Sequence, residues 1–275
     1  MMESYSAKFS IFVPMNETIT SAHNPKVREL LELQEKSRER RERGLFVVEG
    51  LRELERCVAA GFEVRSVFAC PAILQSPLPD LGAGCKVFEV SEEVYRKIAY
   101  REGTEGVVAE VKTRHLRLED LELPDKALIV VLESVEKPGN LGAVLRSADA
   151  AGVDAVIVCD PLTDLYNPNL VRASLGGIFT VPCVACTSAE AIAFLKGRGI
   201  HILTAQLQDS EWYYDCDMTC GTAIVIGTEA TGLTEVWREA ADRHIKIPML
   251  GALDSLNASV SAAILMFEAV RQRNV

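Results

Sequence analysis

Residues 127–132 read ALIVVL, six consecutive apolar side chains without a polar interruption. A strand that is apolar on both sides must be covered on both faces, which is typical of a parallel sheet flanked by helices. Further short apolar runs follow it and alternate with segments of helical periodicity. The strands expected after this first run are Ala155–Val158, Val181–Val184, Ile200–Thr204, Ala223–Ile226 and Ile245–Ile247. Residues 126–275 are therefore predicted to form an α/β domain built on a parallel sheet.

The first half of the chain shows the same alternation over a shorter length. Asn24-Pro25 indicates a helix start, and short apolar strands are expected at 45–48, 64–69, 86–90 and 106–111. Residues 20–112 are thus predicted to form a smaller α/β domain. Residues 1–19 lack periodicity and are expected to be a loose extension, and the charged segment 113–125, which contains Pro124, is the expected linker.

The composition is that of a globular protein, with 275 residues of which 48% are hydrophobic and 25% charged. No apolar run approaches the roughly 20 residues that span a bilayer, and the N-terminus lacks a signal-peptide pattern. The eight cysteines are scattered. Cys183-x-x-Cys186 and Cys216-x-x-x-Cys220 offer a metal site on paper, but neither has a histidine at zinc spacing. Buried thiols in a reducing cytoplasm are the favoured interpretation.

A net charge of −10 argues against a protein that coats nucleic acid without specificity, because phosphate binding requires clustered cations. One local basic cluster is present on the segment after the first helix. Its members, which are the candidate nucleic-acid-binding residues, are Lys36, Arg38, Arg40, Arg41 and Arg43. Glu39 and Glu42 dilute this cluster, so a solvated, salt-bridged helix face is the alternative interpretation and the better one for the cluster alone.

Three polar loops follow strands of the second half. The first, 138–146, contains Gly139-x-x-Gly142, which differs from the G-x-G-x-x-G pattern and disfavours a nucleotide-dependent oxidoreductase. Asn140 can serve here as a helix cap or as a functional residue. Arg146 lies among apolar residues of the expected helix, where a cation needs a partner or a role.

The second loop, IGTEATGL at 226–233, resembles a phosphate-binding loop but lacks the required Lys-Ser/Thr pair, which disfavours a nucleoside triphosphatase. It remains a glycine-bracketed turn at the carboxyl end of a strand, where ligands of such sheets bind. Glu229 within it is either a solvated turn residue or a hydrogen-bond acceptor in a site.

The third loop follows the strand that Pro248 ends, and it carries Ser255 and Asn257 directly before a helix of small residues. Asparagine is a preferred N-cap, so a capped core helix is the simple interpretation. Taken together, the three loops place Asn140, Arg146, Glu229, Ser255 and Asn257 where they can converge on one site.

The order of these loops is similar to a known family. PGNLGAVLRSADAAGV, IVIGTEATGL and IPMLGALDSLNASVSAAILMFEAVRQR resemble the three motifs of the SpoU (TrmH) family of RNA ribose 2′-O-methyltransferases. The N-terminal half is similar to the substrate-binding domain of the ribosomal-RNA members, through Asn24-Pro25, a basic helix and Phe46–Gly50. The chain departs from the family at Lys137, where Asp is common, and at Ala230-Thr231, where Gly-Glu is usual.

The resemblance implies a C-terminal parallel sheet with a deep trefoil knot, which periodicity alone would not suggest. It also implies bound S-adenosylmethionine, a homodimer and an RNA substrate, with ribosomal RNA favoured over transfer RNA. A catalytically silent RNA-binding protein on the same scaffold is the other alternative. The cofactor-binding residues implied by position are Thr204, Gly227, Glu229, Gly232, Ile247 and Leu256.

The resemblance assigns the 2′-hydroxyl proton to Arg146, held by Asn140. Because guanidinium stays protonated, stabilising the developing alkoxide and the neighbouring phosphate is the role we expect for it. Ser255 and Asn257 are expected to orient Arg146, the ribose or the methionine portion, and Glu229 to position its loop or a cation.

Overall fold

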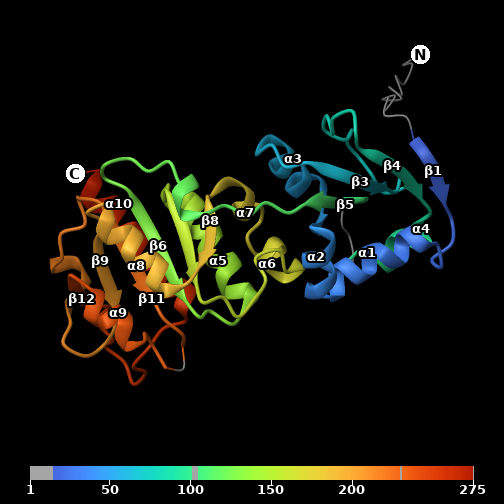
Figure 1. Cartoon of the computed structure of the whole chain (residues 1–275). Coiled ribbons are helices and arrows are strands. Elements are labelled where there is room, and N and C mark those ends of the chain that lie inside the picture. The colour runs from blue at the N-terminus through green and yellow to red at the C-terminus, as the bar shows by residue number, and fades with distance from the viewer. Residues whose placement is uncertain (1–14, 101–104, 230, 275) are drawn as a thin grey trace, which may run out of the picture. The chain divides into compact units, whose positions relative to one another are not determined.

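The computed structural model describes residues 15–100, 105–229 and 231–274, and the chain divides into two compact units, Met1–Thr113 and Arg114–Val275 (Figure 1). The elements of the N-terminal unit are β1 (Met15–Ile19), α1 (Pro25–Glu35), α2 (Ser37–Arg43), β2 (Leu45–Glu49), α3 (Leu51–Ala59), β3 (Val64–Ala69), β4 (Lys86–Val90), α4 (Glu92–Ile98) and β5 (Val107–Lys112). They form the predicted small α/β fold around a five-stranded mixed sheet of order β1-β4-β3-β5-β2. Strands β1, β4 and β3 are parallel, and β5 is antiparallel to both β3 and β2.

The helix starts of this unit follow the local sequence. The side chain of Asn24 accepts a hydrogen bond from the main-chain N–H of Lys26 at 2.9 Å, and Ser91 caps α4 in the same way. Leu30 and Leu33 of α1 are fully buried against the sheet together with Ile98 of α4.

The expectation of a loose extension over residues 1–19 needs a correction. Residues 15–19 form β1, which pairs in parallel with β4, and Ile19 is buried in the core. The rest of that stretch, residues 1–14, lies outside the described part of the chain.

The C-terminal unit contains η1 (Leu118–Asp120), β6 (Leu128–Glu133), α5 (Pro138–Ala151), β7 (Ala155–Cys159), α6 (Pro168–Ala173), α7 (Gly177–Thr180), β8 (Cys183–Cys186), α8 (Ser188–Gly197), β9 (His201–Ala205), β10 (Glu211–Trp212), η2 (Tyr213–Asp215), β11 (Thr222–Ile226), α9 (Glu235–Ala240), β12 (Arg243–Lys246) and α10 (Ala258–Arg273). Its sheet has seven strands in the order β10-β12-β9-β11-β6-β7-β8, and every neighbouring pair is parallel. The predicted parallel α/β domain is confirmed.

Helices cover both faces of this sheet. Ile129 and Val131 of β6 share a core with Leu195 of α8 and Trp237 of α9. Alternate side chains of a strand point to opposite faces, and on the other face α10 packs against β6, β11 and the neighbouring helix α5. This explains why residues 127–132 are apolar without interruption.

The segment expected as a linker packs within the C-terminal unit. Leu118 and Leu121 are buried in the same core as β6 and α8. The charge of the segment lies on the intervening positions, which is why composition alone suggests an exposed connection.

The C-terminal end of α10 is hydrogen-bonded to the segments that precede β6 and β11, at the amino ends of these strands. The Arg273 guanidinium donates to the main-chain carbonyls of Met218 at 2.8 Å, Lys126 at 2.7 Å and Cys220 at 2.7 Å. These bonds hold the C-terminal helix in place, so its first residue lies at a fixed position beside the carboxyl ends of the strands.

Strand order determines which loops meet. Strands β12, β9, β11 and β6 are consecutive neighbours, so the loops that follow them lie along one edge of the sheet. The direction of the connections changes at β6, between β7 on one side and β11 on the other, which is the position where open α/β sheets bind ligands. Over the described part of the chain, no helix is long and apolar enough to cross a bilayer.

Candidate active site

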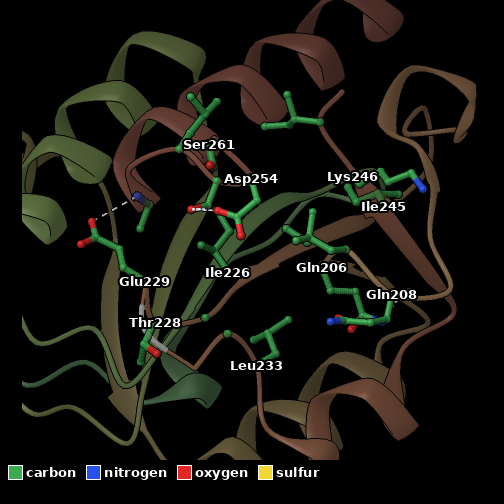
Figure 2. A pocket seen from close by; sticks show the side chains of 18 of the residues that line it. Gln206, Gln208, Ile226, Thr228, Glu229, Leu233, Ile245, Lys246, Asp254 and Ser261 are labelled. Carbon is green, nitrogen blue, oxygen red and sulfur yellow. Dashed lines mark hydrogen bonds between the residues drawn. The ribbon is translucent and has the colours of Figure 1, made fainter. Parts of the chain in front are cut away.

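A pocket of about 340 Å³ lies at the carboxyl ends of β9, β11 and β12, and Figure 2 shows the side chains that line it. Its walls come from the loop after β9, the turn after β11, the loop after β12 and the first turns of α10. The volume is within the range of small-molecule sites. The apolar walls include Ile226, Leu233 and Ile245, and carboxylates from Glu229 and Asp254 also line the pocket.

The turn after β11 depends on two glycines. The main-chain N–H of Thr228 donates to the Gly232 carbonyl at 3.2 Å, and the N–H of Gly232 donates back at 3.1 Å. A Cβ at Gly227 would overlap the backbone of Gly232 and Leu233, and Gly232 has a φ of +69°. The turn therefore requires glycine at both positions, one for space and one for conformation.

Glu229 is the centre of a hydrogen-bond network that joins the three loops. Its carboxylate accepts from the Lys137 ammonium at 2.7 Å, from the Asn140 amide at 2.9 Å and from the Asn257 amide at 2.7 Å. The Asn257 amide also donates to the Asn140 side-chain oxygen, at 3.1 Å. Residues more than a hundred positions apart in the chain are thus held at one point.

The charges of this network reinforce one another. Hydrogen bonds from Lys137 and then Asn140 hold the pKa of Glu229 below its usual range. The same contact with Glu229 raises the pKa of Lys137. The carboxylate is therefore ionised at neutral pH, and its ion pair with Lys137 is intact. Lys137 stands where the family that the sequence resembles commonly has Asp.

Asn257 has two roles at once. Its side-chain oxygen accepts from the main-chain N–H of Ser259 at 3.0 Å, which makes it the N-cap of α10, as the sequence predicts. Its amide nitrogen is left to donate to Glu229. Ser255 lines the pocket and donates to Asp254 at 3.2 Å, so it lies outside the Glu229 network.

Asn140 is not the cap of α5. The cap position is Lys137, and Asn140 is the third residue of the helix, with its side chain directed to Glu229 and Asn257. Asn140 is expected to hold Arg146, whereas the hydrogen bonds of its side chain go to Glu229 and Asn257 in the other two loops.

Arg146 lies six residues further along α5 and is exposed. Among the described residues no hydrogen bond or ion pair to its side chain is recorded, so its guanidinium is available to a bound anion. Helix α5, which carries Arg146, packs closely against α6 and α7. A Cβ at Gly177 would lie 2.8 Å from the Leu145 carbonyl, and one at Gly142 would lie 2.7 Å from the Leu170 carbonyl.

Of the residues implied as cofactor contacts, five line the pocket: Gly227, Glu229, Gly232, Ile247 and Leu256. Thr204 does not, and its assignment as a contact needs correction. It is fully buried, and its hydroxyl shares a hydrogen bond of 2.6 Å with His244 Nδ1. The pocket is instead lined by the residues that directly follow, from Ala205 onward.

Sequence reasoning missed several lining residues, among them Gln206, Arg238, Lys246 and Asp254. Gln206 follows the expected strand that ends at Thr204, so its position after a strand end is a usable signal. Arg238 lies in the middle of a short helix, and nothing in the local sequence distinguishes it.

The basic cluster of the N-terminal unit is mostly neutralised. Arg40 is 3% exposed and donates to the main-chain carbonyl of Leu33 at 2.6 Å, so its assignment to RNA binding is corrected to a structural one. Its guanidinium satisfies carbonyls at the end of α1. Arg38 pairs with Glu42 at 2.7 Å.

Arg43 and Lys36 are engaged in the same way. Arg43 bonds to Glu32 and Glu39, and Lys36 lies 3.5 Å from Glu32. Arg41 is exposed, and no partner of its side chain is recorded among the described residues. Three of the five cations therefore form salt bridges, as the alternative interpretation of the cluster expects: Lys36, Arg38 and Arg43.

Comparison with known proteins gives a family match for each of the two units. Residues 127–267 match the SpoU rRNA Methylase family, and residues 24–109 match the MRM3-like substrate binding domain. A 23S rRNA (guanosine(2553)-2′-O)-methyltransferase of Bacillus subtilis is 29% identical over 90% of this chain and 97% of its own length. A 23S rRNA (guanosine-2′-O-)-methyltransferase of Ralstonia nicotianae is 36% identical over 70% of this chain and 80% of its own.

The fold has solved counterparts. The AdoMet-bound rRNA methyltransferase of Sinorhizobium meliloti superposes with a TM-score of 0.84 and 28% identity, covering 92% of this chain and 97% of that one. The likeness extends over both units of the chain.

Proposed function

Because this chain belongs to the SpoU rRNA methylase family, we infer that it uses S-adenosylmethionine to methylate a ribose 2′-hydroxyl of ribosomal RNA. The observation that carries this inference is the hydrogen-bond network in which Glu229 joins the three loops. This network lies at the wall of a pocket of cofactor size. The rRNA-modifying relatives match most of the chain, whereas a tRNA-modifying enzyme from A. aeolicus covers 57% of it. Ribosomal RNA is therefore preferred to transfer RNA as substrate.

The pocket suits this cofactor chemically. S-adenosylmethionine supplies a methyl group already activated on a positively charged sulfonium. The Asp254 carboxylate attracts a cationic ligand, whereas the carboxylate of Glu229 is already paired with Lys137. The apolar walls formed by Ile226, Leu233 and Ile245 suit the faces of an aromatic ring. We assign cofactor binding to these residues together with Gly227, whose turn positions the main chain of the second loop.

The protein must place the ribose oxygen in line with the transferred methyl group and stabilise the charge that develops as the hydroxyl loses its proton. Glu229, Asn140 and Asn257 perform the positioning, because their network fixes the cofactor loops relative to α5. Arg146 projects from the same helix with no competing partner recorded among the described residues. We assign to it the stabilisation of the developing alkoxide and of a neighbouring phosphate.

RNA recognition is assigned to the N-terminal unit, which matches a substrate-binding domain. Arg41 is the strongest single candidate for a phosphate contact there. Lys36, Arg38 and Arg43 contribute only if RNA displaces their glutamate partners. Arg40 is excluded from this surface, since it is buried and bonded to main-chain carbonyls.

A homodimer is also proposed. Leu250 and Leu253 in the third loop are 98% and 75% exposed, and Val260 and Phe267 of α10 are about half exposed. Apolar side chains gathered on one loop and helix favour contact with a second copy. Light scattering tests this, since a monomer at working concentration contradicts it. The trefoil knot implied by the family and a cytoplasmic location, where ribosomal RNA is found, remain predictions.

The proposed function is tested by mapping 2′-O-methyl groups in ribosomal RNA from cells with and without the gene. The expected result is the loss of one defined 2′-O-methyl site in the deletion strain and its restoration by the wild-type gene. The variant Arg146→Ala should not restore it. Identical maps in all strains would contradict the proposal.

A further inference from the structure

Two buried polar atoms of the described residues have no hydrogen-bond partner, the side-chain oxygen of Gln206 and Nε of Arg238. Both residues line the pocket described above. Buried polar groups are nearly always paired, because an unpaired one loses its hydration without compensation. One unpaired acceptor and one unpaired donor in the walls of the same pocket therefore indicate a ligand that supplies both partners.

The orientation of Gln206 is determined by its other contacts. Its main-chain N–H donates to the Ile245 carbonyl at 3.0 Å, which fixes the residue between β9 and β12. Its amide nitrogen donates to the Gln208 carbonyl at 2.9 Å. The amide oxygen is thus the group left over, and it can only accept.

Arg238 is less tightly engaged. Its nearest recorded acid is Glu235 in the preceding turn of α9, with 4.0 Å between Nη1 and the carboxylate, and that contact leaves Nε unused. A guanidinium can only donate. Gln206 and Arg238 together offer one acceptor and one donor.

We propose that Gln206 and Arg238 recognise the edge of the adenine base of the cofactor. This rests on the proposed function and names the residues that determine base specificity within it. Adenine carries an N–H donor at its 6-amino group, with ring-nitrogen acceptors on either side. That arrangement complements an amide oxygen and an Nε–H. Hypoxanthine, with a carbonyl at position 6 and a proton on N1, presents the opposite pattern at these two positions, so the Gln206 oxygen would face a carbonyl instead of an amino group.

The position of Gln206 agrees with a cofactor that binds with its base directed away from Glu229. In Figure 2, Gln206 and Gln208 lie on the other side of the pocket from Glu229. The reacting end of the cofactor must face α5, which carries Arg146 and contacts Glu229 through Asn140. The base is then directed away from Glu229, between the apolar side chains near Gln206.

The test is calorimetric titration of the full-length protein with three probes. S-adenosylhomocysteine carries the intact base, S-inosylhomocysteine reverses its hydrogen-bond pattern, and 5′-methylthioadenosine keeps the base but lacks the amino-acid portion. The variants are Gln206→Met and Arg238→Met, and Gln75→Met is the matched control, because it replaces an exposed glutamine of the N-terminal unit outside the pocket lining. Thermal melting of each variant verifies that it is folded.

The wild type should prefer S-adenosylhomocysteine to the inosine analogue by tenfold or more, since a site built to bond a polar edge rejects the mismatched one. Gln206→Met should weaken binding of S-adenosylhomocysteine about five- to tenfold and reduce the preference for adenine. Gln206→Ala, which also removes the acceptor oxygen, should lose the same preference if the methionine variant fails to fold. Gln75→Met should leave both affinities unchanged.

Arg238→Met should weaken S-adenosylhomocysteine and 5′-methylthioadenosine by the same factor. A loss confined to S-adenosylhomocysteine would instead place Arg238 against the amino-acid carboxylate and overturn its assignment to the base. Unchanged adenine preference in Gln206→Met would overturn the assignment of Gln206. If the wild type binds none of the three probes, the proposed function itself fails, which is a different result from failed discrimination by a protein that binds.

Discussion

Replacing Arg146 should slow methyl transfer and leave the free energy of unfolding almost unchanged. Its side chain is exposed on α5, with no hydrogen bond or ion pair recorded among the described residues. Surface substitutions of this kind change the free energy of unfolding by less than about 0.5 kcal/mol. A donor aimed at charge that develops in the transition state typically contributes about 3–4 kcal/mol, which corresponds to a loss of two to three decades in rate.

Single-turnover methylation with saturating RNA and cofactor is the appropriate assay, because it isolates the chemical step from binding and product release. Arg146→Ala should be slowed by roughly a hundredfold or more, with unchanged affinity for S-adenosylhomocysteine. Arg146→Lys should recover only part of the rate, since it keeps the charge but loses the planar fork. Lys196→Ala, which removes an exposed cation of α8 outside the pocket lining, is the matched control and should be silent.

Either of two results would refute the catalytic role of Arg146. Retention of more than about a third of the wild-type rate means that less than ~1 kcal/mol is missing, which is too little for a transition-state contact. Loss of cofactor binding or of the folded state means that Arg146 is a structural residue.

Three further outcomes are expected. Gly227→Ala should abolish binding of S-adenosylhomocysteine in calorimetry, because its Cβ would overlap the backbone across the turn; normal affinity would contradict that packing. Arg40→Ala should lower the free energy of unfolding in urea by about 2–3 kcal/mol, since it leaves buried carbonyls unpaired, whereas Arg41→Ala should weaken RNA binding without loss of stability. The hydrogen bond from Lys137 lowers the pKa of Glu229, so ionised Glu229 stabilises the folded state at pH values above the usual glutamate pKa. This stabilisation is lost as the pH falls through the lowered pKa. The stability difference between wild type and Glu229→Gln should therefore be constant near neutral pH and shrink in acid; a difference that persists unchanged in acid would contradict the ion pair.

Local sequence was sufficient for the elements whose causes are local. The run at 127–132 predicts a strand buried on both faces, and the side chains of Asn24, Ser91 and Asn257 cap helices where the sequence places helix starts. Strand β1 was missed, because an edge strand of five residues is defined by its pairing with β4, some seventy residues away.

The site could be predicted in part. Ligands of parallel sheets bind at the carboxyl ends of the strands, so the sequence brings the three loops to one edge and indicates Glu229 as a candidate. The sequence does not reveal that Asn257 serves both as the cap of α10 and as a donor to Glu229. Arg40 was assigned to RNA binding because charge density does not distinguish a cation that faces solvent from one that faces main-chain carbonyls. Gln206 and Arg238 become candidates only when unpaired atoms can be counted in three dimensions.

The central claim is that the methyl group goes to a ribose oxygen of ribosomal RNA, and one chemical measurement tests it directly. The purified protein is incubated with S-adenosylmethionine labelled in the methyl group and with ribosomal RNA from the deletion strain, and the RNA is then hydrolysed in alkali. Alkaline cleavage requires a free 2′-hydroxyl, so a 2′-O-methyl group protects the adjacent phosphodiester. The label is expected in a single alkali-stable dinucleotide. Label in mononucleotides, which indicates methylation of a base, or no label in RNA at all would contradict it.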